Sequence, residues 1–543
     1  MPFCNMKNLI STLVLLLGIF AAQAQKPFKE FIYAQTDKNF YLAGERIWVK
    51  LYNLDEHNNL HQGSRVAYVQ LVGDTPNTIQ CVLEMDSASA DGVLELPFTV
   101  ASGRYKLCAY TRNMLNMGEE AIFSKTIHVF NPLRYDNKVD KVAVEQSVAY
   151  QPFDGGDLHI STDKTTYSPR QEVTIDLSAL PADAVMAVSV ARADGWRLCD
   201  TDIAHYNVPS LTLSGNLTPE TESQIIEGTY TSSNGTPALN ANLSLRSPVV
   251  RYYPGIVDNS DNVQYFTPLM HGVNTAFTGV ERGGSIELKS PFRAPLLGEL
   301  IPVEIARGSI DDIQERSIGI QAARYFGTDS IGYRPIAVDG LHRYELTARY
   351  DMDNYRRFNS FKETFIEYIY LLGTTTIDGK QRITMFDEFT GRQNNGNTLV
   401  LLDGVAVMNH EDLLNYNPHY CRYIDIYVGH YVFANQEYAG ILNIRTPRGN
   451  KMHFTLPDNS REQTLLNGIQ LPATMPLVCR DSNAAPMPAQ SPDTRHTLYW
   501  NPEAKATTLK CFTSDLKGTF VVTVEGITPD GKRIQANTQF TVK

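Results

Sequence analysis

The amino-acid sequence predicts a mainly β protein that combines tandem β-sandwich domains with one small α+β domain. The chain of 543 residues contains 28 Tyr and 23 Phe but 3 Trp, together with 36 Gly and 28 Pro. This mixture is typical of short strands joined by turns. Many short segments also alternate apolar and polar side chains with the period of two that a half-buried strand has. A turn motif followed by such a strand occurs twice, which predicts a repeated β domain.

Length and charge limit the organisation and the partners. At about 150 residues per domain, the length predicts three to four globular units. The formal net charge is −11, with 43% hydrophobic and 20% charged residues, which is a globular and not a disordered composition. A mildly acidic chain lacks the basic surface that phosphate neutralisation needs, so we expect no nucleic-acid partner.

The N-terminal residues 1–24 have the pattern of a secretory signal peptide. Lys7 precedes an apolar run from Leu9 to Ala22, and Ala22-Gln23-Ala24 is a small-residue site that predicts cleavage before Gln25. The run is shorter than the roughly 20 residues that a membrane span needs, and no later stretch reaches that length. We therefore expect an exported mature chain without a transmembrane span, periplasmic or associated with the outer membrane, with the cell surface as a further location.

The cysteines allow two interpretations. An exported chain meets oxidising conditions, and Cys81 with Cys108, or Cys479 with Cys511, are close enough in sequence to share a small β domain. Small buried thiols are the alternative. No CxxC or Cys/His spacing typical of a zinc site occurs.

The repeat begins with a Thr-Asp-Lys turn. Thr36-Asp37-Lys38, followed by Tyr41, recurs 126 residues later as Thr162-Asp163-Lys164, followed by Tyr167. Each copy leads into an alternating strand. We expect the Asp and Thr to satisfy local backbone groups while the Tyr covers the edge of the domain.

These residues resemble the macroglobulin domains of the alpha-2-macroglobulin superfamily, which open with TDKxxYxPGExV. The first copy has Ala43 where that motif has Pro, and the second has Arg170 where it has Gly. The resemblance implies macroglobulin-like, that is immunoglobulin-like, β-sandwiches over residues 25–132 and 151–222. The reactive Cys-Gly-Glu-Gln thioester is absent from the sequence, so the resemblance does not imply a covalent protease trap.

A third β region follows the repeat. Residues 227–245, with an Asn234-Gly235 turn, predict a hairpin. The spacing resembles a carboxypeptidase-regulatory-like β-sandwich, a non-catalytic module, over residues 223–306. In the connecting segment 307–358 we expect strands at Ser317–Ala323 and Arg343–Arg349.

The stretch from 359 to 449 has a more specific order of elements. A buried strand, Leu399–Leu402, ends in a turn, Asn409 can cap a short helix, and two further strands follow at Tyr423–Val428 and Tyr438–Thr446. This order resembles the plug domain of TonB-dependent outer-membrane receptors. The resemblance implies five residues for interactions of the plug, namely Asp403, Gly404, Tyr438, Gly440 and Asn443.

The rest of the chain argues against a complete receptor. A barrel of 22 strands needs several hundred residues, and 94 follow Gly449. We expect a linker at 450–492 and a C-terminal β-sandwich at 493–543, with Phe520, Val522 and Val524 on one face. The whole arrangement resembles exported Bacteroidetes proteins with macroglobulin-type domains and a plug-like domain without a barrel.

The candidate chemical motifs are each better explained as turns. His57 and His61 lie in a polar hairpin loop, Ser514–Lys517 lacks the companion motifs of penicillin-binding enzymes, and Asp258–Asn262 lacks the Gly and Glu of a calcium loop. Asp403 precedes a Gly and more simply forms a turn. We therefore expect no catalytic residue, no metal, no cofactor and no enzymatic activity.

Two functions are consistent with the sequence. The first is a non-enzymatic scaffold or docking protein that meets an outer-membrane or periplasmic protein partner through its plug-like domain. The second is an accessory protein that captures a small ligand, a glycan or peptide, for a TonB-dependent uptake system. Aromatic residues that could stack on sugars in the second case are Tyr252, Tyr253, Tyr265 and Phe266.

Overall fold

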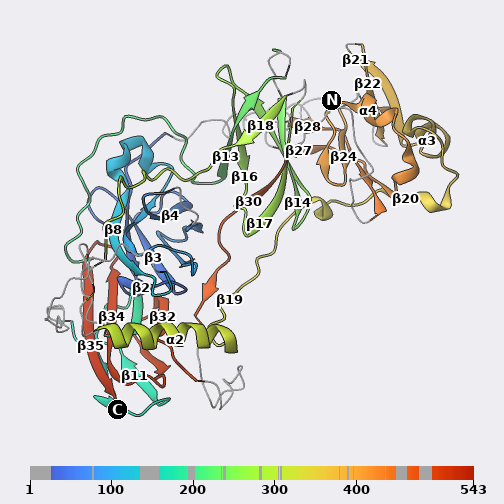
Figure 1. The fold of residues 1–543 in the computed structure, drawn as a ribbon. Coiled ribbons are helices and arrows are strands. Elements are labelled where there is room, and N and C mark those ends of the chain that lie inside the picture. The colour runs from blue at the N-terminus through green and yellow to red at the C-terminus, as the bar shows by residue number, and fades with distance from the viewer. Residues whose placement is uncertain are drawn as a thin grey trace, which may run out of the picture. The chain divides into compact units, whose positions relative to one another are not determined.

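The computed structural model describes residues 26–543, except for 76–78, 135–157, 194–201, 234, 236–239, 281–283, 304, 306–308, 378, 388–390, 395–396, 434–435, 448–461 and 476–491. The predicted signal peptide therefore lies outside the described residues. The protein is mainly β, as the sequence predicts (Figure 1). Within the described part of the chain, no helix has both the length and the apolar character needed to cross a membrane.

The chain divides into two compact units. The first unit is formed from residues 1–222, 294–333 and 472–543, and the second from residues 223–293 and 334–471. The chain thus crosses from one unit to the other four times, so neither unit is one continuous stretch of sequence.

The first unit begins with a sandwich of eight strands. Three strands form one sheet in the order β1-β3-β6, and five form the other in the order β2-β8-β7-β4-β5. Contacts of β1 with β7 and β8 join the two sheets. The strands are β1 (Phe31–Thr36), β2 (Phe40–Leu42), β3 (Arg46–Leu54), β4 (Val66–Val72), β5 (Gln80–Glu84), β6 (Ser89–Glu95), β7 (Gly103–Tyr110) and β8 (Phe123–Phe130).

A second sandwich of eight strands has the same strand order, but its strands come from two stretches of the chain, residues 161–192 and 497–542. Its sheets have the orders β9-β11-β33 and β10-β35-β34-β12-β32. The strands are β9 (Ser161–Thr162), β10 (Thr166–Tyr167), β11 (Glu172–Asp176), β12 (Val185–Arg192), β32 (Thr497–Ala504), β33 (Thr508–Phe512), β34 (Gly518–Ile527) and β35 (Arg533–Val542). One hydrophobic core contains side chains from both stretches.

The two stretches 151–222 and 493–543, which the sequence predicts as separate sandwiches, therefore contribute strands to the same two sheets. In the first sandwich, β4 is followed directly in the chain by β5. In the second sandwich the chain leaves after β12 and returns only at β32, which pairs with β12 in antiparallel register. Phe520, Val522 and Val524 point together into this shared core, as the alternation of their strand predicts.

The repeated turn has the same hydrogen bonds in both copies. In the first, the Tyr41 hydroxyl donates to Asp37 Oδ1 at 2.7 Å, and the Trp48 amide donates to the same oxygen at 3.1 Å. In the second, Tyr167 donates to Asp163 Oδ1 at 2.7 Å, and the Thr174 amide donates to it at 2.8 Å. The aspartate fixes the turn to the following strand, and the tyrosine ring closes the end of the core.

The cysteines of the first sandwich do not pair. Cys81 lies on β5 opposite Val69, and Cys108 lies on β7 opposite Gln70, so β4 separates them. Two strand spacings put the cysteines roughly 10 Å apart, beyond the reach of a disulfide. Both are free and buried, and burial raises the pKa of each thiol to about 12. Of the two interpretations that the sequence left open, buried thiols are therefore correct for Cys81 and Cys108 and a bridge between them is wrong. For the other pair, Cys479 lies outside the described residues.

The expected strand at Ser317–Ala323 is wrong, because this segment lies inside α2 (Ile310–Phe326). Its buried residues are Ile313, Arg316 and Gly319, three apart as on one helical face. Acidic residues occupy the first turn, and Gly327 ends the helix with φ +65°, so the helix signals were present at its ends. The short alternation of apolar residues around Ile318 therefore does not produce a strand.

The helix α2 packs on the first sandwich of its unit. Ile313 joins Phe40 and Leu42 in a small apolar cluster. Beside it, the Arg316 guanidinium donates to both Glu45 carboxylate oxygens at 2.6 Å. A short two-stranded ribbon, β19 (Gly332–Tyr333) with β31 (Ala473–Thr474), completes the first unit.

The second unit contains a sheet of seven strands in the order β18-β13-β16-β15-β14-β17-β30. Its strands are β13 (Gln224–Thr231), β14 (Asn240–Ser247), β15 (Arg251–Val257), β16 (Asn262–Thr267), β17 (Val273–Val280), β18 (Ser285–Leu288) and β30 (Glu462–Asn467). Six of these strands come from the stretch 223–306, which was expected to form a separate sandwich. The hairpin predicted over residues 227–245 is wrong, because β13 pairs with β16 and β18 while β14 pairs with β15 and β17. The edge strand β30 comes from residues expected to be a linker, so part of 450–492 is structured.

The rest of the second unit is an α+β part that we call the plug-like part. Its main sheet has the order β20-β26-β29-β24-β25, so the strands expected at Leu399–Leu402, Tyr423–Val428 and Tyr438–Thr446 are neighbours, the last of them beginning at Ile441. The expected strand at Arg343–Arg349 begins later, as β20, after a short 3-10 turn at Leu341–Arg343. The elements are β20 (Ala348–Asp351), α3 (Phe361–Tyr368), β21 (Leu372–Ile377), β22 (Lys380–Asp387), β23 (Arg392–Gln393), β24 (Leu399–Leu402), β25 (Val405–Ala406), α4 (His410–Leu414), β26 (Tyr423–Tyr427), β27 (Tyr431–Phe433), β28 (Gln436–Tyr438) and β29 (Ile441–Arg445).

Candidate functional site

The main sheet of the plug-like part is covered on both faces. Because side chains alternate along a strand, Val400 and Leu402 enter a core with α3 and α4. Leu399 and Leu401 point the other way and pack with Tyr252 of the seven-stranded sheet. The two parts of the second unit therefore share an apolar interface, and the cavities described below lie along it.

Three of the five plug residues form one buried turn. Asp403 and Gly404 join β24 to β25 with φ of +48° and +80°, the left-handed pair of a two-residue hairpin turn. Asp403 accepts hydrogen bonds from the Thr446 amide and hydroxyl at 2.8 and 2.7 Å. Asn443 accepts one from the Gly404 amide at 3.2 Å. Asp403 and Asn443 are only 7% and 5% exposed, so this turn holds strand ends together inside the protein.

The other two plug residues lie elsewhere. Gly440 is buried with φ +139°, and a Cβ there would overlap the Met385 sulfur. Tyr438 is half-buried, and its hydroxyl lies 2.7 Å from the Tyr252 hydroxyl. Of the five residues, Tyr438 alone lines one of the cavities described here.

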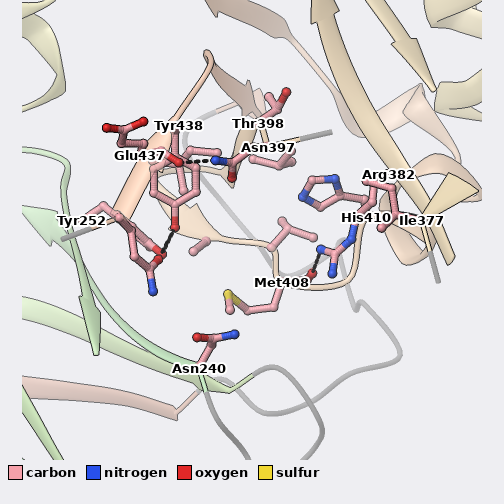
Figure 2. A pocket seen from close by; sticks show the side chains of 15 residues that line it. Asn240, Tyr252, Ile377, Arg382, Asn397, Thr398, Met408, His410, Glu437 and Tyr438 are labelled. Atoms are coloured by element: carbon pink, nitrogen blue, oxygen red, sulfur yellow. Dashed lines mark hydrogen bonds between the residues drawn. The ribbon is translucent and has the colours of Figure 1, made fainter. Parts of the chain in front are cut away.

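The first cavity, which we call the polar cavity, has a volume of about 450 Å³ and opens to solvent. Such a volume is within the usual range of small-molecule sites, about 300–1,000 Å³. Tyr252 and Tyr438 stand on one side of it and Arg382 and His410 on the other (Figure 2). The remaining polar side chains of its wall are Asn240, Asn397, Thr398, Gln436 and Glu437.

The side of the polar cavity that Arg382 and His410 form is fixed by backbone contacts. His410 is the first residue of α4, which Asn409 caps as expected, and its Nδ1 accepts a hydrogen bond from the Ile383 amide at 3.0 Å. Burial, followed by the charge of Arg382, lowers the pKa of His410 to about 3. The imidazole is therefore neutral at physiological pH. Arg382 donates to the Met408 carbonyl at 3.1 Å, which holds its guanidinium in place.

The second cavity, which we call the aromatic cavity, has a volume of about 280 Å³. Its aromatic lining consists of Tyr252, Tyr253, Phe266, Tyr344 and Phe433. Three of the four aromatic residues singled out from the sequence thus meet here. The fourth, Tyr265, is fully buried in the core of the seven-stranded sheet.

The remaining sequence candidates stay simple turns or buried groups. Asp258 accepts from the amides of Ser260 and Asn262, and these hydrogen bonds lower its pKa, as in an ordinary Asx turn. Ser514 is fully buried. In the described part of the chain, no group of three His, Cys, Asp or Glu side chains is placed to hold a metal ion.

Sequence reasoning missed most of the polar cavity. Asn240, Arg382 and His410 come from segments far apart in the chain, and none belongs to a motif. The available signal was indirect: the strand at Leu399–Leu402 is apolar at every position, which predicts burial on both faces and hence a partner layer on the far side.

Comparisons with known proteins leave the family open. No family model matches the sequence, and no curated protein matches it. Solved structures with some likeness include Escherichia coli alpha-2-macroglobulin activated by porcine elastase, with TM-score 0.24 and 9% identity over 95% of this chain and 44% of that one. Salmonella alpha-2-macroglobulin reacted with methylamine gives TM-score 0.23 and 9% identity over 96% and 40%. Dimeric latent PorU from Porphyromonas gingivalis gives TM-score 0.16 and 9% identity over 94% and 34%.

This chain therefore spans less than half the length of each of these three structures. Likenesses at such TM-scores carry no functional argument. The function proposed below rests on the geometry of the second unit.

Proposed function

We propose that the chain is a non-enzymatic binding protein of the cell envelope that captures a small hydrophilic ligand in the polar cavity. The supporting observation is the cavity itself, which combines amide, hydroxyl and guanidinium groups with a tyrosine wall. The two sandwiches of the first unit are a scaffold that carries the inserted second unit.

The state of the ionisable groups agrees with binding and not with catalysis. General acid–base chemistry uses a group whose pKa lies near the working pH. His410 is far from that condition, because its pKa is about 3 and its Nδ1 is engaged with the backbone. Arg382 is likewise held against a backbone carbonyl.

The test is a thermal-shift screen of sugars, amino acids and short peptides on the full chain, with a variant that fills the cavity. Ile377 lines the polar cavity and is 39% exposed, so Ile377→Trp narrows the cavity without disturbing a core. Ile366→Trp, at a position 70% exposed on α3, is the matched control. A true ligand at about 100 times its Kd stabilises the protein by about 2.7 kcal/mol.

We expect the ligand-induced shift in melting temperature in the wild type and in Ile366→Trp, and its loss in Ile377→Trp. A shift that persists in Ile377→Trp would place the ligand outside the polar cavity. A screen in which no compound shifts the melting temperature would contradict ligand capture.

A second candidate is docking of the plug-like part on an outer-membrane protein assembly. What favours it is a pair of apolar side chains that are unusually exposed for their type, Ile366 at 70% and Tyr370 at 76%. The buried turn of Asp403, Gly404 and Asn443 does not offer a contact surface. The test is co-purification with outer membranes of an Ile366→Asp/Tyr370→Asp variant. Ile318→Asp, at a position of α2 that is 59% exposed, is the control, and equal recovery of both variants would exclude this surface.

A further inference from the structure

The polar and aromatic cavities are neighbours. Both are lined by Tyr252 and Leu399, so these residues separate one cavity from the other. Tyr252 is held between Tyr438, at a ring-centroid distance of 5.7 Å, and Phe433, at 5.6 Å, both edge to face. Because the two cavities share this wall, a ligand with more than one ring-sized unit is long enough to contact both.

The strand edges next to the polar cavity are already occupied. At the edge strand β25, the Ala406 amide donates to Ser244 Oγ at 3.1 Å. Beside β28, Asn397 donates from its side chain to the Glu437 carbonyl, and its own carbonyl accepts from the Ala439 amide at 2.8 Å. A peptide that binds by strand addition needs free backbone groups at such an edge. These contacts argue against an extended peptide in the polar cavity.

The arginines around the two cavities are already engaged with protein groups. In the polar cavity, Arg382 is opposed by Glu437, and His410 is neutral. At the aromatic cavity, Arg343 pairs with Asp339 at 3.6 Å, and the second arginine of the lining, Arg251, donates to the side-chain oxygen of Asn274. Recognition of a phosphate or carboxylate uses concentrated positive charge, commonly an arginine fork. Because Arg382, Arg343 and Arg251 each have a protein partner, the lining favours an uncharged ligand.

The remaining groups suit a molecule with polar edges and apolar faces. The side-chain amides of Asn240, Asn397 and Gln436 contain both donors and an acceptor, as sugar hydroxyls do. Asn397 also donates to the Glu437 carbonyl, and Gln436 accepts from the Tyr438 hydroxyl at 2.8 Å, so both amides are held in a fixed orientation. The neighbouring aromatic cavity offers aromatic rings for stacking. Among them, Phe266 is 46% exposed, so its side chain can be removed without opening a core. A pyranose ring has both properties, since its hydroxyls project from the edge and its C–H groups form an apolar face.

We infer that the ligand of the second unit is a neutral oligosaccharide, with hydroxyls bound in the polar cavity and a further sugar ring stacked in the aromatic cavity. This inference rests on the proposed function and names its ligand class. It assigns Tyr252 as the side chain between the two sugar subsites and Phe266 as a stacking residue of the second.

The test is isothermal titration calorimetry of the full chain with a length series of neutral sugars, from glucose, mannose, galactose and xylose to their hexasaccharides. We expect at least one series to bind, with affinity rising between the monosaccharide and the trisaccharide and then levelling off. Phe266→Ala removes a stacking surface worth about one order of magnitude in affinity. It should weaken the trisaccharide by about tenfold and leave the monosaccharide unchanged. Ile256→Ala, 56% exposed on the neighbouring strand β15, should bind like the wild type.

The possible failures are distinct. If no neutral sugar binds, but a peptide or an acidic uronate oligosaccharide binds and Ile377→Trp abolishes that binding, the oligosaccharide inference is overturned and ligand capture stands. If affinity does not rise with length, or if Phe266→Ala binds the trisaccharide like the wild type, the two-subsite arrangement is overturned. If no compound of any class binds, both the inference and the proposed function fail. The melting temperature of each variant without ligand verifies that it is folded.

Discussion

The ion pair between Arg316 and Glu45 offers a sharp test of how the first unit is held together. The side chains are only 4% and 8% exposed, and two hydrogen bonds of 2.6 Å join them. Burial raises the pKa of Glu45, but the charges of Arg316 and then Lys38 outweigh it and leave the pKa below its usual value of 4.5. The carboxylate is therefore ionised in the folded protein and depends on its cations.

Removal of Arg316 should leave a buried, poorly compensated charge. Loss of one partner of a buried pair typically costs about 3–5 kcal/mol. We expect the lower end for Arg316→Met, about 3 kcal/mol, because Lys38 Nζ still lies 3.7 Å from Glu45. At roughly 2–4 °C per kcal/mol for a domain of this size, the melting temperature of the first unit should fall by about 6–12 °C. The double variant Arg316→Met/Glu45→Gln should recover part of the loss, since no charge is then left unpaired.

The pH dependence has a defined sign. A folded-state pKa below the unfolded value means that Glu45 contributes stability above about pH 4.5, and this contribution is lost as the pH falls through the folded pKa. Differential scanning calorimetry of the wild type and the double variant from pH 7 to pH 3 measures this contribution of Glu45 to stability. A melting temperature for Arg316→Met within 1 °C of the wild type at pH 7 would refute the reasoning, as would a double variant less stable than the single one.

Further predictions concern the second unit and the thiols. Gly404→Ala should destabilise the protein by about 1–3 kcal/mol more than Gly379→Ala. Both glycines have φ near +80°, but only at Gly404 would a Cβ meet a neighbour, the Val250 side chain at 2.6 Å. Urea unfolding of the two variants measures the difference in the free energy of unfolding, and equal losses would exclude a packing effect. Burial lowers the pKa of His410 to about 3 in the folded protein, so only the unfolded state binds a proton there as the pH drops below about 6.5. The wild type should therefore lose about 1.3 kcal/mol more stability between pH 7.5 and 5.5 than His410→Asn does. Parallel profiles of the free energy of unfolding against pH would contradict this. Cys81 and Cys108 should resist iodoacetamide in the folded protein and both react after denaturation without reductant, as read by peptide mass spectrometry; protection that only a reductant removes would show a disulfide.

Much of the fold could be predicted from local patterns. The Thr-Asp-Lys turns, the alternating strands that follow them and the turn at Asp403-Gly404 are encoded within a few residues, and the structure contains these elements. The strand order β26-β29-β24 agrees with the three strands expected in the plug-like part. In each case the determining interaction lies close in sequence or repeats a short motif.

What could not be predicted depends on distant pairing. Nothing local tells that the strand at 185–192 pairs with the strand at 497–504, across about three hundred residues. The same holds for β30, whose sequence resembles a linker until it is paired with β17. The polar cavity is formed by side chains from such distant segments, so its residues carry no motif. The helix α2 was missed for another reason, since a short apolar alternation was given more weight than the acidic start and Gly327 at the end.

The interruption of the second sandwich between β12 and β32 has a consequence for how the protein is made. During synthesis, the first sandwich is complete once its eight strands have emerged, but half of the second must wait for the last fifty residues of the chain. Until then β11 lacks its partner strand β33, and β12 lacks its two partner strands β32 and β34. Such unpaired strands invite aggregation. A chain truncated before Thr497 should therefore aggregate more readily, and be degraded by proteases faster, than the full chain, even though every residue of the second unit has already been made.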